Sequence, residues 1–435
     1  MCGNNIDLKK NPAGPLEASI YIRNEWQLYQ GSEEGENTGS AMLSVFPEGK
    51  ATAYTYNYWG SPGRTTSSNT RFGNILYEPL SRTDSHPAFI TTSYNGKANP
   101  LTISSRWIYK LSGRGYSDWQ FIGDNFDLRP GEGFTMKGVE GVNTHVRLYG
   151  VANNPGGEQR YDFRGTPNTG TISLDIIKDE ILLVGNPYPS ARDADKFIND
   201  NFLLLANVLF WIDGGTNSHN LSDYLGGYSV YNLTGGVSPS VISSVSGLGT
   251  AANVTPKRYM AIGQGFFVTA IGTGSMLLNN SQRIFKTEDG INSNFYKTSN
   301  IKNKEASKST LVNSFIRIGY EDPEMFHRQL LLGFLPEAPA DLSFNPGYDA
   351  LMIDPREDEL FYIIDNDLTK KYVIQGVGVY DNLYEFPLGL IIIEAGTHTI
   401  MLDNVENFTD PVYIEDTVLN ITHNLSDSSF NPNLP

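Results

Sequence analysis

An internal repeat constrains the fold of this chain more than any other feature of its sequence. Residues 128–138 and 260–270 both carry Gly-x-Gly-Phe followed by an alternating strand pattern. A matching element precedes each copy, Trp59-Gly60-Ser61-Pro62 in the first and Val184-Gly185-Asn186-Pro187 in the second. Such repeated order with unequal spacing is expected of two related domains whose loops differ in length. The glycines permit positive φ or a close neighbouring backbone, and the phenylalanine anchors the strand in a core.

Composition favours strands and turns over helices. The chain has 24 Tyr, 22 Phe and 43 Gly among 435 residues, while charged residues make up only 18%. Tyr and Phe are enriched in strands, and Gly and Asn are enriched in turns. We therefore expect an all-β fold of tandem antiparallel β-sandwich or jelly-roll-like domains, with a duplicated N-terminal pair and a C-terminal sandwich.

The chain is too long for one ordinary domain. We expect N-terminal strands at 1–50, which could end an upstream domain, and a first repeat domain at 51–170. The second repeat domain is expected at 171–298. A polar linker at 299–310 then leads to the C-terminal sandwich at 311–435.

Strand patterns alternate with turn signals in the C-terminal sandwich. The expected strands are Ser314–Tyr320, Arg328–Phe334, Leu360–Ile364, Tyr372–Val379, Leu388–Glu394, His398–Leu402 and Val412–Glu415. The best helix candidate in the whole chain is 190–202, with Ser190 as N-cap. Asp193 then falls in the first turn, where a carboxylate suits the helix dipole.

The charge balance excludes several classes of function. The formal net charge is −16, whereas binding to nucleic acid or to an anionic membrane needs clustered Lys and Arg. No apolar run approaches the roughly 20 residues of a membrane span, so we expect none. The one cysteine, Cys2, cannot form a disulfide within the chain.

The sequence predicts no catalytic residues and no cofactor, and we do not expect an enzyme. No two of the six histidines lie at metal-ligand spacing, and there is no His-Glu-x-x-His, Gly-x-Ser-x-Gly or phosphate-binding loop. The carboxylate pair of a glycosidase can lie far apart in a sequence, so that alternative stays open.

Two kinds of binding residue remain as candidates. Asp193 with Asp195 and Asp365 with Asp367 are candidate ligands of a structural calcium ion, although 365–367 lacks the glycine and distant glutamate of a calcium loop. Trp119, with Tyr116 just before it, is the aromatic residue most expected to be exposed and to stack on a sugar.

The ordered motifs of the chain resemble a known family of surface proteins. The segments that carry the resemblance are Tyr56–Pro62, Gly131–Gly138, Tyr161–Asn168, Val184–Ser190, Gly263–Val268 and His327–Gly333. In this order they are similar to the region upstream of the C-terminal sorting domain in flavobacterial (Bacteroidota) proteins exported by the type IX secretion system. Each motif alone is short, and the specificity comes from their fixed order.

The resemblance implies a cellular location but no enzyme activity and no binding residues. It implies an extracellular or outer-membrane-surface protein whose partners are the type IX machinery during export and a glycan or another surface protein afterwards. The leading hypothesis is a non-catalytic stalk or adhesin-like module that presents or binds ligands. The alternative is an ancillary carbohydrate-binding region of a secreted polysaccharide-degrading enzyme.

Overall fold

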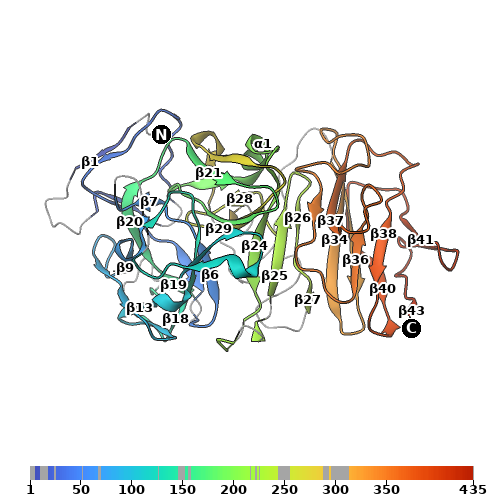
Figure 1. Cartoon of the computed structure of the whole chain (residues 1–435), viewed down its shortest axis with the longest axis horizontal. Helices are drawn as coiled ribbons and strands as arrows, with labels where there is room; N and C mark the ends of the chain where they lie inside the picture. The colour runs from blue at the N-terminus through green and yellow to red at the C-terminus, as the bar shows by residue number, and fades with distance from the viewer. Residues whose placement is uncertain are drawn as a thin grey trace. The chain divides into compact units, whose positions relative to one another are not determined.

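The regular structure of the chain is almost entirely β-strand (Figure 1). The computed structural model describes residues 5–9, 18–23, 26–50, 52–66, 70–125, 127–145, 152–154, 158–215, 217–220, 223–224, 226–242, 255–287, 293–294 and 313–434. In these ranges α1 (Ala194–Asp200) is the only α-helix, so the predicted all-β, multi-domain fold is confirmed. No helix in them has the length and apolar composition needed to cross a membrane.

The chain forms two compact units. Unit 1 contains residues 1–225 and 257–297, and unit 2 contains 226–256 and 298–435. Chain segments that are distant in sequence therefore meet inside unit 2. Figure 1 shows β26, in yellow-green, beside the orange β34, and β27 pairs with β34 directly.

These units differ from the predicted domains. The two repeat domains expected at 51–170 and 171–298 lie together in unit 1, except for residues 226–256, which belong to unit 2. The expected linker at 299–310 lies outside the described residues.

Unit 1 is built from many short strands. They are β1 (Asp7–Leu8), β2 (Ile20–Ile22), β3 (Thr38–Gly39), β4 (Leu43–Val45), β5 (Glu48–Lys50), β6 (Tyr56–Trp59), β7 (Gly63–Arg64), β8 (Thr70–Arg71), β9 (Leu76–Pro79), β10 (Ser85–Pro87), β11 (Phe89–Thr91), β12 (Gly96–Ala98), β13 (Leu101–Ser104), β14 (Tyr109–Gly113), β15 (Trp119–Phe121), β16 (Asp127–Leu128), β17 (Phe134–Lys137), β18 (Val139–Glu140), β19 (Glu158–Arg160), β20 (Asp162–Pro167), β21 (Ile172–Ile176), β22 (Ile181–Gly185), β23 (Ala191–Asp193), β24 (Leu205–Asp213), β28 (Tyr259–Met260), β29 (Gly265–Ala270), β30 (Gly274–Leu278), β31 (Arg283–Ile284) and β32 (Ser293–Asn294). Short 3-10 helices interrupt them at η1 (Phe72–Asn74), η2 (Ser105–Trp107), η3 (Tyr116–Asp118) and η5 (Asn280–Gln282).

Strands near the N-terminus complete a sheet of unit 1. Its order is β10-β9-β20-β4-β2, with β4 pairing antiparallel to β20. Ile22 and Leu43 from the N-terminal strands are buried in the same core cluster as Trp59 and Phe163. These strands therefore belong to unit 1 and do not form the end of a separate upstream domain, because their apolar side chains fill its core.

The two repeats pair with each other as well as within themselves. β6 pairs with β17 in the first repeat, and β22 pairs with β29 in the second. Two isolated bridges then join the repeats, Trp59 to Gln264 and Val184 to Glu132. Trp59 and Val184 occupy equivalent places in the two motifs, and so do Glu132 and Gln264. The contact is therefore reciprocal, like the self-complementary contact of a two-fold dimer.

Backbone hydrogen bonds follow the same reciprocity. The Gly60 N–H donates to the Gly263 carbonyl at 2.7 Å, and the equivalent Gly185 N–H donates to the Gly131 carbonyl at 2.9 Å. Gly131 and Gly263 have φ of 90° and 73°, a region that glycine reaches without strain. The predicted roles of the repeat glycines are thus confirmed at the point where the two repeats meet.

The helix begins later than the sequence predicts. Asp193 is the N-cap of α1, and its side chain accepts a hydrogen bond from the Asp195 N–H at 3.1 Å. Ser190 was the expected cap, but it precedes the short strand β23, and its hydroxyl accepts a hydrogen bond from Arg283 Nε at 2.9 Å. Ala194, Phe197 and Ile198 form the buried face of α1, whereas Phe202 lies beyond its end and is 53% exposed.

The second unit follows the predicted strand pattern closely. Its strands are β25 (Gly226–Tyr231), β26 (Gly236–Val237), β27 (Val241–Ile242), β33 (Ser314–Glu321), β34 (Phe326–Phe334), β35 (Ala350–Leu351), β36 (Glu359–Tyr362), β37 (Tyr372–Val377), β38 (Leu388–Ile391), β39 (Gly396–Thr397), β40 (Thr399–Glu406), β41 (Tyr413–Asp416), β42 (Ile421–Asn424) and β43 (Asn433–Leu434). The main sheet has the order β38-β36-β37-β34-β33-β40, and β41 forms a separate hairpin with β42. Every predicted strand overlaps an observed one. The strands β25, β26, β27, β35, β39, β42 and β43 were not predicted, and five of these seven have only two residues.

Replacing Gly185 by Ala tests the crossing of the repeats. A Cβ at this position would lie 2.3 Å from Gly60 Cα, so the backbones would have to separate. We expect the free energy of unfolding to fall by about 2 kcal/mol or more, as measured by urea denaturation. The control is Gly115→Ala, because a Cβ there meets nothing within 4 Å in the described part of the chain. Equal stability of the two variants would contradict the close approach.

Candidate functional site

An aromatic face lies on the outer side of β6 and β17 in unit 1. Along β6, Tyr56 and Tyr58 are half-buried, while Asn57 and Trp59 are buried, as expected of a strand with one face on the core. The register of β6 with β17 places Lys137 directly opposite Tyr56. Residues paired in this way point to the same side of the sheet, so Lys137 lies among the outward aromatic side chains.

Lys137 is enclosed by three aromatic rings. Its Nζ atom lies 3.7 Å from the ring centroid of Trp107, 4.7 Å from that of Tyr56 and 5.0 Å from that of Tyr224. The ammonium group carries only donors, so it donates to His219 Nδ1 at 3.0 Å and to the Tyr224 hydroxyl. Lys137 is 2% exposed, and the cation–π contacts offset part of its desolvation.

Burial shifts the titration of this cluster. It lowers the pKa of Lys137 to about 8, with the charge of Asp213 acting in the opposite direction. Burial and then the neighbouring Lys137 charge lower the pKa of His219, and burial raises the pKa of Tyr224. At pH 7 the cluster therefore holds a charged lysine beside a neutral histidine.

Further rings extend the cluster toward solvent. Trp107 stacks on His219 with centroids 4.9 Å apart and planes 14° apart, and the exposed Tyr94 lies 5.8 Å from Trp107. His219 Nε2 contacts Asn95 Oδ1 at 2.6 Å, and Asn95 Nδ2 donates to Glu140 at 2.8 Å. Polar hydrogen-bonding groups thus lie directly beside the stacked rings.

The predicted ligand residues lie along the same face. Trp119, the first residue of β15, is half-buried, and its ring centroid lies 6.5 Å from that of Tyr58 and 6.1 Å from that of Phe267. Tyr116 is 70% exposed on the adjoining η3. Burial and the nearby Tyr109 raise the pKa of Tyr116. The structure therefore joins Trp119 to the aromatic face and places Tyr116 at its exposed margin.

The first predicted calcium pair is bonded to an arginine. The Arg258 guanidinium contacts both oxygens of Asp193 at 2.8 Å and one oxygen of Asp195 at 3.0 Å. The hydrogen bonds that Arg258 donates to Asp193 raise the pKa of Arg258, and Asp193 is buried and caps α1. In the structure these carboxylates fix the start of the helix.

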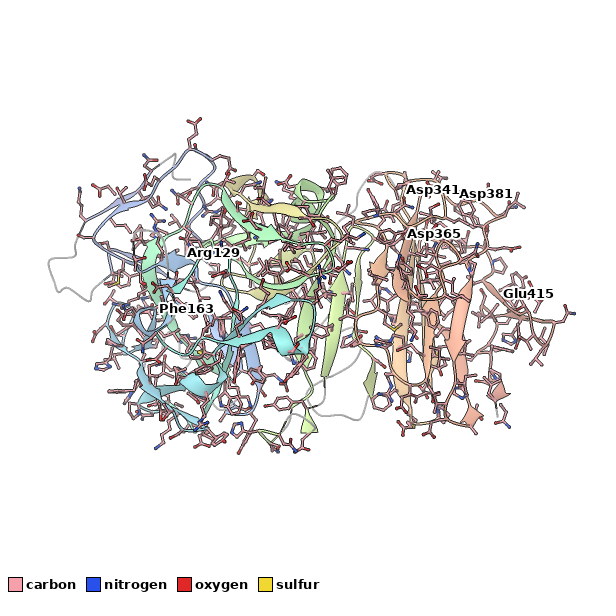
Figure 2. The ribbon with its side chains drawn as sticks, viewed as in Figure 1. Arg129, Phe163, Asp341, Asp365, Asp381 and Glu415 are labelled. Atoms are coloured by element: carbon pink, nitrogen blue, oxygen red, sulfur yellow. The ribbon has the colours of Figure 1, made fainter. Side chains whose placement is uncertain are left out.

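The second predicted pair, in unit 2, bonds to its own loops. Asp365, which Figure 2 shows at one end of unit 2, accepts a hydrogen bond from the Phe344 N–H at 3.2 Å. Asp367 accepts from the Thr369 N–H at 3.0 Å and pairs with Lys370 at 3.2 Å. Hydrogen bonds from Thr369 and then Lys370 lower the pKa of Asp367. The two predicted pairs lie in different units.

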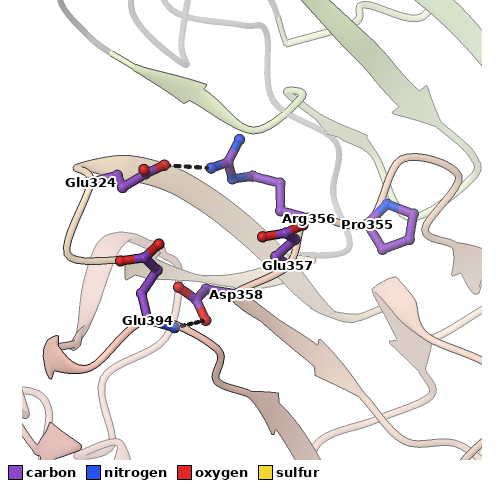
Figure 3. Close-up of a pocket in the computed structure, with 6 residues that line it drawn as sticks. All are labelled: Glu324, Pro355, Arg356, Glu357, Asp358 and Glu394. Atoms are coloured by element: carbon purple, nitrogen blue, oxygen red, sulfur yellow. Dashed lines mark hydrogen bonds and ion pairs between the residues drawn. The ribbon is translucent and has the colours of Figure 1, made fainter. Parts of the chain in front are cut away.

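A small pocket in unit 2 gathers further carboxylates (Figure 3). Glu324, Arg356, Glu357, Asp358 and Glu394 line a volume of about 360 Å³. Arg356 pairs with Glu324 at 3.3 Å, and Asp358 accepts a hydrogen bond from the Glu394 N–H at 3.2 Å. Across the described ranges, no group of three or more His, Cys, Asp or Glu residues is arranged to hold a metal ion. Glu324 therefore pairs with an arginine, and Asp358 holds the backbone at Ile393 and Glu394.

Comparison with known proteins assigns the whole chain to one family. The model of DUF8693, described as a domain of unknown function, matches residues 3–433. The chain belongs to this family. No curated protein and no solved structure matches it. The DUF8693 match covers both units but names no activity.

Sequence reasoning missed the centre of this site in the DUF8693 chain. Lys137, at the end of the first repeat motif, meets His219 and Tyr224, which lie more than 80 residues further along the sequence and are marked by no local motif. One local signal was present, because Tyr56 and Tyr58 alternate with Asn57 and Trp59 in a strand pattern. Alternation predicts that the two tyrosines share the outer face.

Replacing Lys137 by Met tests the electrostatics of the cluster. The folded chain lowers the pKa of Lys137 from its ordinary value of 10.5 to about 8, so lysine-bearing protein gains stability as the pH rises between these values. The variant lacks that gain. Relative to the unchanged chain, its free energy of unfolding should fall by about 1 kcal/mol between pH 7 and pH 9.5, after solvent screening is allowed for.

Urea denaturation at both pH values gives the measurement. The control is Lys97→Met on β12, since Lys97 is exposed and outside the cluster. Its stability difference from the unchanged chain should be the same at both pH values. A pH-independent difference for Lys137→Met would show that the lysine is not desolvated by its aromatic neighbours.

Proposed function

We propose that this chain is a non-catalytic module of a secreted cell-surface protein and binds a saccharide on the aromatic face of unit 1. The observation that carries the proposal is a continuous band of rings, Tyr94, Trp107, Tyr56, Tyr58 and Trp119. Consecutive centroids in this band are 5.8 to 6.5 Å apart. Side chains of this kind combine a broad apolar surface with polar edges.

The chemistry of the band suits a saccharide better than a purely apolar ligand. A pyranose ring presents a face of C–H groups, which packs on an aromatic ring, and an edge of hydroxyl groups. Asn95 and Glu140 offer hydrogen-bonding groups beside the rings, and the exposed Arg106 lies over Tyr94 at 4.5 Å. Such stacking with a few convergent polar groups is the usual composition of a small-ligand site.

The resemblance to type IX substrates supports the rest of the proposal. It supports a location outside the cell or on the outer-membrane surface, with the type IX machinery as a partner during export. The leading role is then a stalk or adhesin-like module that presents or binds ligands. The net charge of −16 supports a partner other than nucleic acid.

The aromatic band also favours a second candidate function. An ancillary carbohydrate-binding region of a polysaccharide-degrading enzyme would need the same stacking surface. A catalytic domain elsewhere in the parent gene would favour this reading, whereas long adhesive repeats there would favour the adhesin-like module. Either way the aromatic face of unit 1 is the proposed binding surface.

A glycan array probed with the purified chain, with calcium and with chelator, tests the proposal. We expect saturable binding to one class of glycan, and Trp119→Ala should weaken it by about tenfold through the loss of one stacking platform. The control is Trp26→Ala, because Trp26 is 70% exposed and lies outside the band. Circular dichroism should show that both variants are folded.

Two results would overturn the saccharide proposal. One is the absence of binding under both conditions. The other is binding that neither Trp119→Ala nor Tyr94→Ala weakens, since the glycan would then bind elsewhere. Binding that is lost with chelator would identify a calcium requirement in addition to the aromatic face.

A further inference from the structure

Unit 2 contains a groove that is distinct from the aromatic face of unit 1. Its volume is about 1070 Å³, which is at the upper end of the range for small-molecule sites. Its floor comes from the main sheet, including Ile316 on β33, Leu332 on β34 and Leu360 on β36. The β41–β42 hairpin and the chain near Phe430 line its other side. The groove is thus a hollow between a sheet and the hairpin that faces it.

Most of the lining is apolar, and apolar side chains continue to the mouth. Leu390 on the edge strand β38 is 37% exposed, Tyr413 on β41 is 61% exposed, and Val418 at the hairpin turn is 90% exposed. Exposed apolar groups that are contiguous with an apolar hollow commonly mark a site for a ligand. The groove could therefore admit an apolar body from solvent.

A buried hydroxyl at the floor of the groove has no hydrogen-bond partner among the described residues. Tyr362 on β36 lines the groove and is fully buried, and its hydroxyl is unsatisfied. Leu388 on β38 pairs with Tyr362 and also lines the groove. A buried hydroxyl without a partner destabilises the fold, and a ligand whose hydrogen-bonding group reaches it would remove that cost.

The charge of the lining limits which ligand can bind. Every charged side chain that lines the groove is a carboxylate, namely Glu385, Glu415 and Asp416. Glu415 lies on the hairpin (Figure 2). A negatively charged ligand would be repelled, while an uncharged one would not be.

We propose that this groove binds an uncharged amphiphile with a long apolar body and one hydrogen-bonding group that reaches Tyr362. The apolar body fills the hollow between the sheet and the hairpin. The hydrogen-bonding group satisfies the tyrosine hydroxyl. The carboxylates at the rim exclude anionic amphiphiles such as fatty-acid anions. This binding activity is independent of the saccharide site proposed in unit 1.

The first experiment uses the whole chain and the fluorescent probe N-phenyl-1-naphthylamine, which brightens in apolar surroundings. We expect saturable enhancement, and displacement of the probe by 1-decanol. Decanoate, which has the same chain length, should displace it at least about tenfold more weakly at pH 8 because of the rim carboxylates. The double substitution Glu385→Gln with Glu415→Gln should narrow this difference.

Substitutions locate the site. Leu390→Trp places a large side chain at the mouth and should abolish saturable enhancement, while Leu383→Trp should not, because Leu383 is 82% exposed and is not part of the lining. Tyr362→Phe should lower the affinity for 1-decanol by about fivefold. It should not lower the free energy of unfolding, since the hydroxyl that it removes is unpaired. Tyr348→Phe is the control for binding, because Tyr348 does not line the groove and its hydroxyl donates to the Glu337 carbonyl; its affinity for 1-decanol should be unchanged.

Three results would overturn the proposal. They are no saturable enhancement by the unchanged chain, equal displacement by decanoate and 1-decanol, and unchanged binding in Leu390→Trp. Unchanged affinity of folded Tyr362→Phe for 1-decanol would remove the proposed hydrogen bond. None of these results depends on whether the aromatic face of unit 1 binds a glycan.

Discussion

The close crossing of two backbones at Gly60 and Gly185 is the constraint on which unit 1 depends. A Cβ on either glycine would lie 2.5 Å or less from the other residue's Cα. Only glycine fits there, and the approach brings each glycine N–H within hydrogen-bonding distance of the opposite repeat. The two repeats therefore lie in one compact unit, and Ala261 and Ile262 of the second repeat are buried in the core cluster of the first, so residues 51–170 do not form a domain of their own.

The aromatic face follows from that crossing. Trp59 follows Tyr58 on β6 and points into the core, where its ring centroid lies 5.3 Å from that of Phe163. Because side chains alternate along a strand, Tyr56 and Tyr58 then face outward. The second repeat then supplies the other parts of the site. The ring centroid of Phe267 on β29 lies 5.2 Å from that of Tyr58. His219, also in the second repeat, contacts Lys137 of the first repeat. A binding surface made in this way needs both repeats, because neither one contains the whole set of rings.

Features that depend on the local sequence could be predicted, whereas contacts between distant parts of the chain could not. The strands of unit 2 were predictable because each one alternates or runs apolar between turn residues, and the repeat glycines were predictable because their backbone role is local. The sequence also placed Trp119 among the exposed aromatics, although Tyr58 and Phe267 cover part of it. What no local pattern could predict was the partner of each group. A carboxylate such as Asp193 looks the same in sequence whether it holds calcium or the distant Arg258, and the burial of Lys137 depends on a loop far along the chain.

Native-state hydrogen exchange of the whole chain, followed by mass spectrometry at increasing urea, tests the shared core most directly. The informative peptides are those that contain Gly60 and Gly185, whose N–H groups donate across the two repeats. If the repeats form one unit, both peptides should exchange through the same opening, with equal free energies. Exchange of the first repeat at a clearly lower free energy than the second would mean that they unfold as separate domains. That result would contradict the account of a single core and of a binding face built from both repeats.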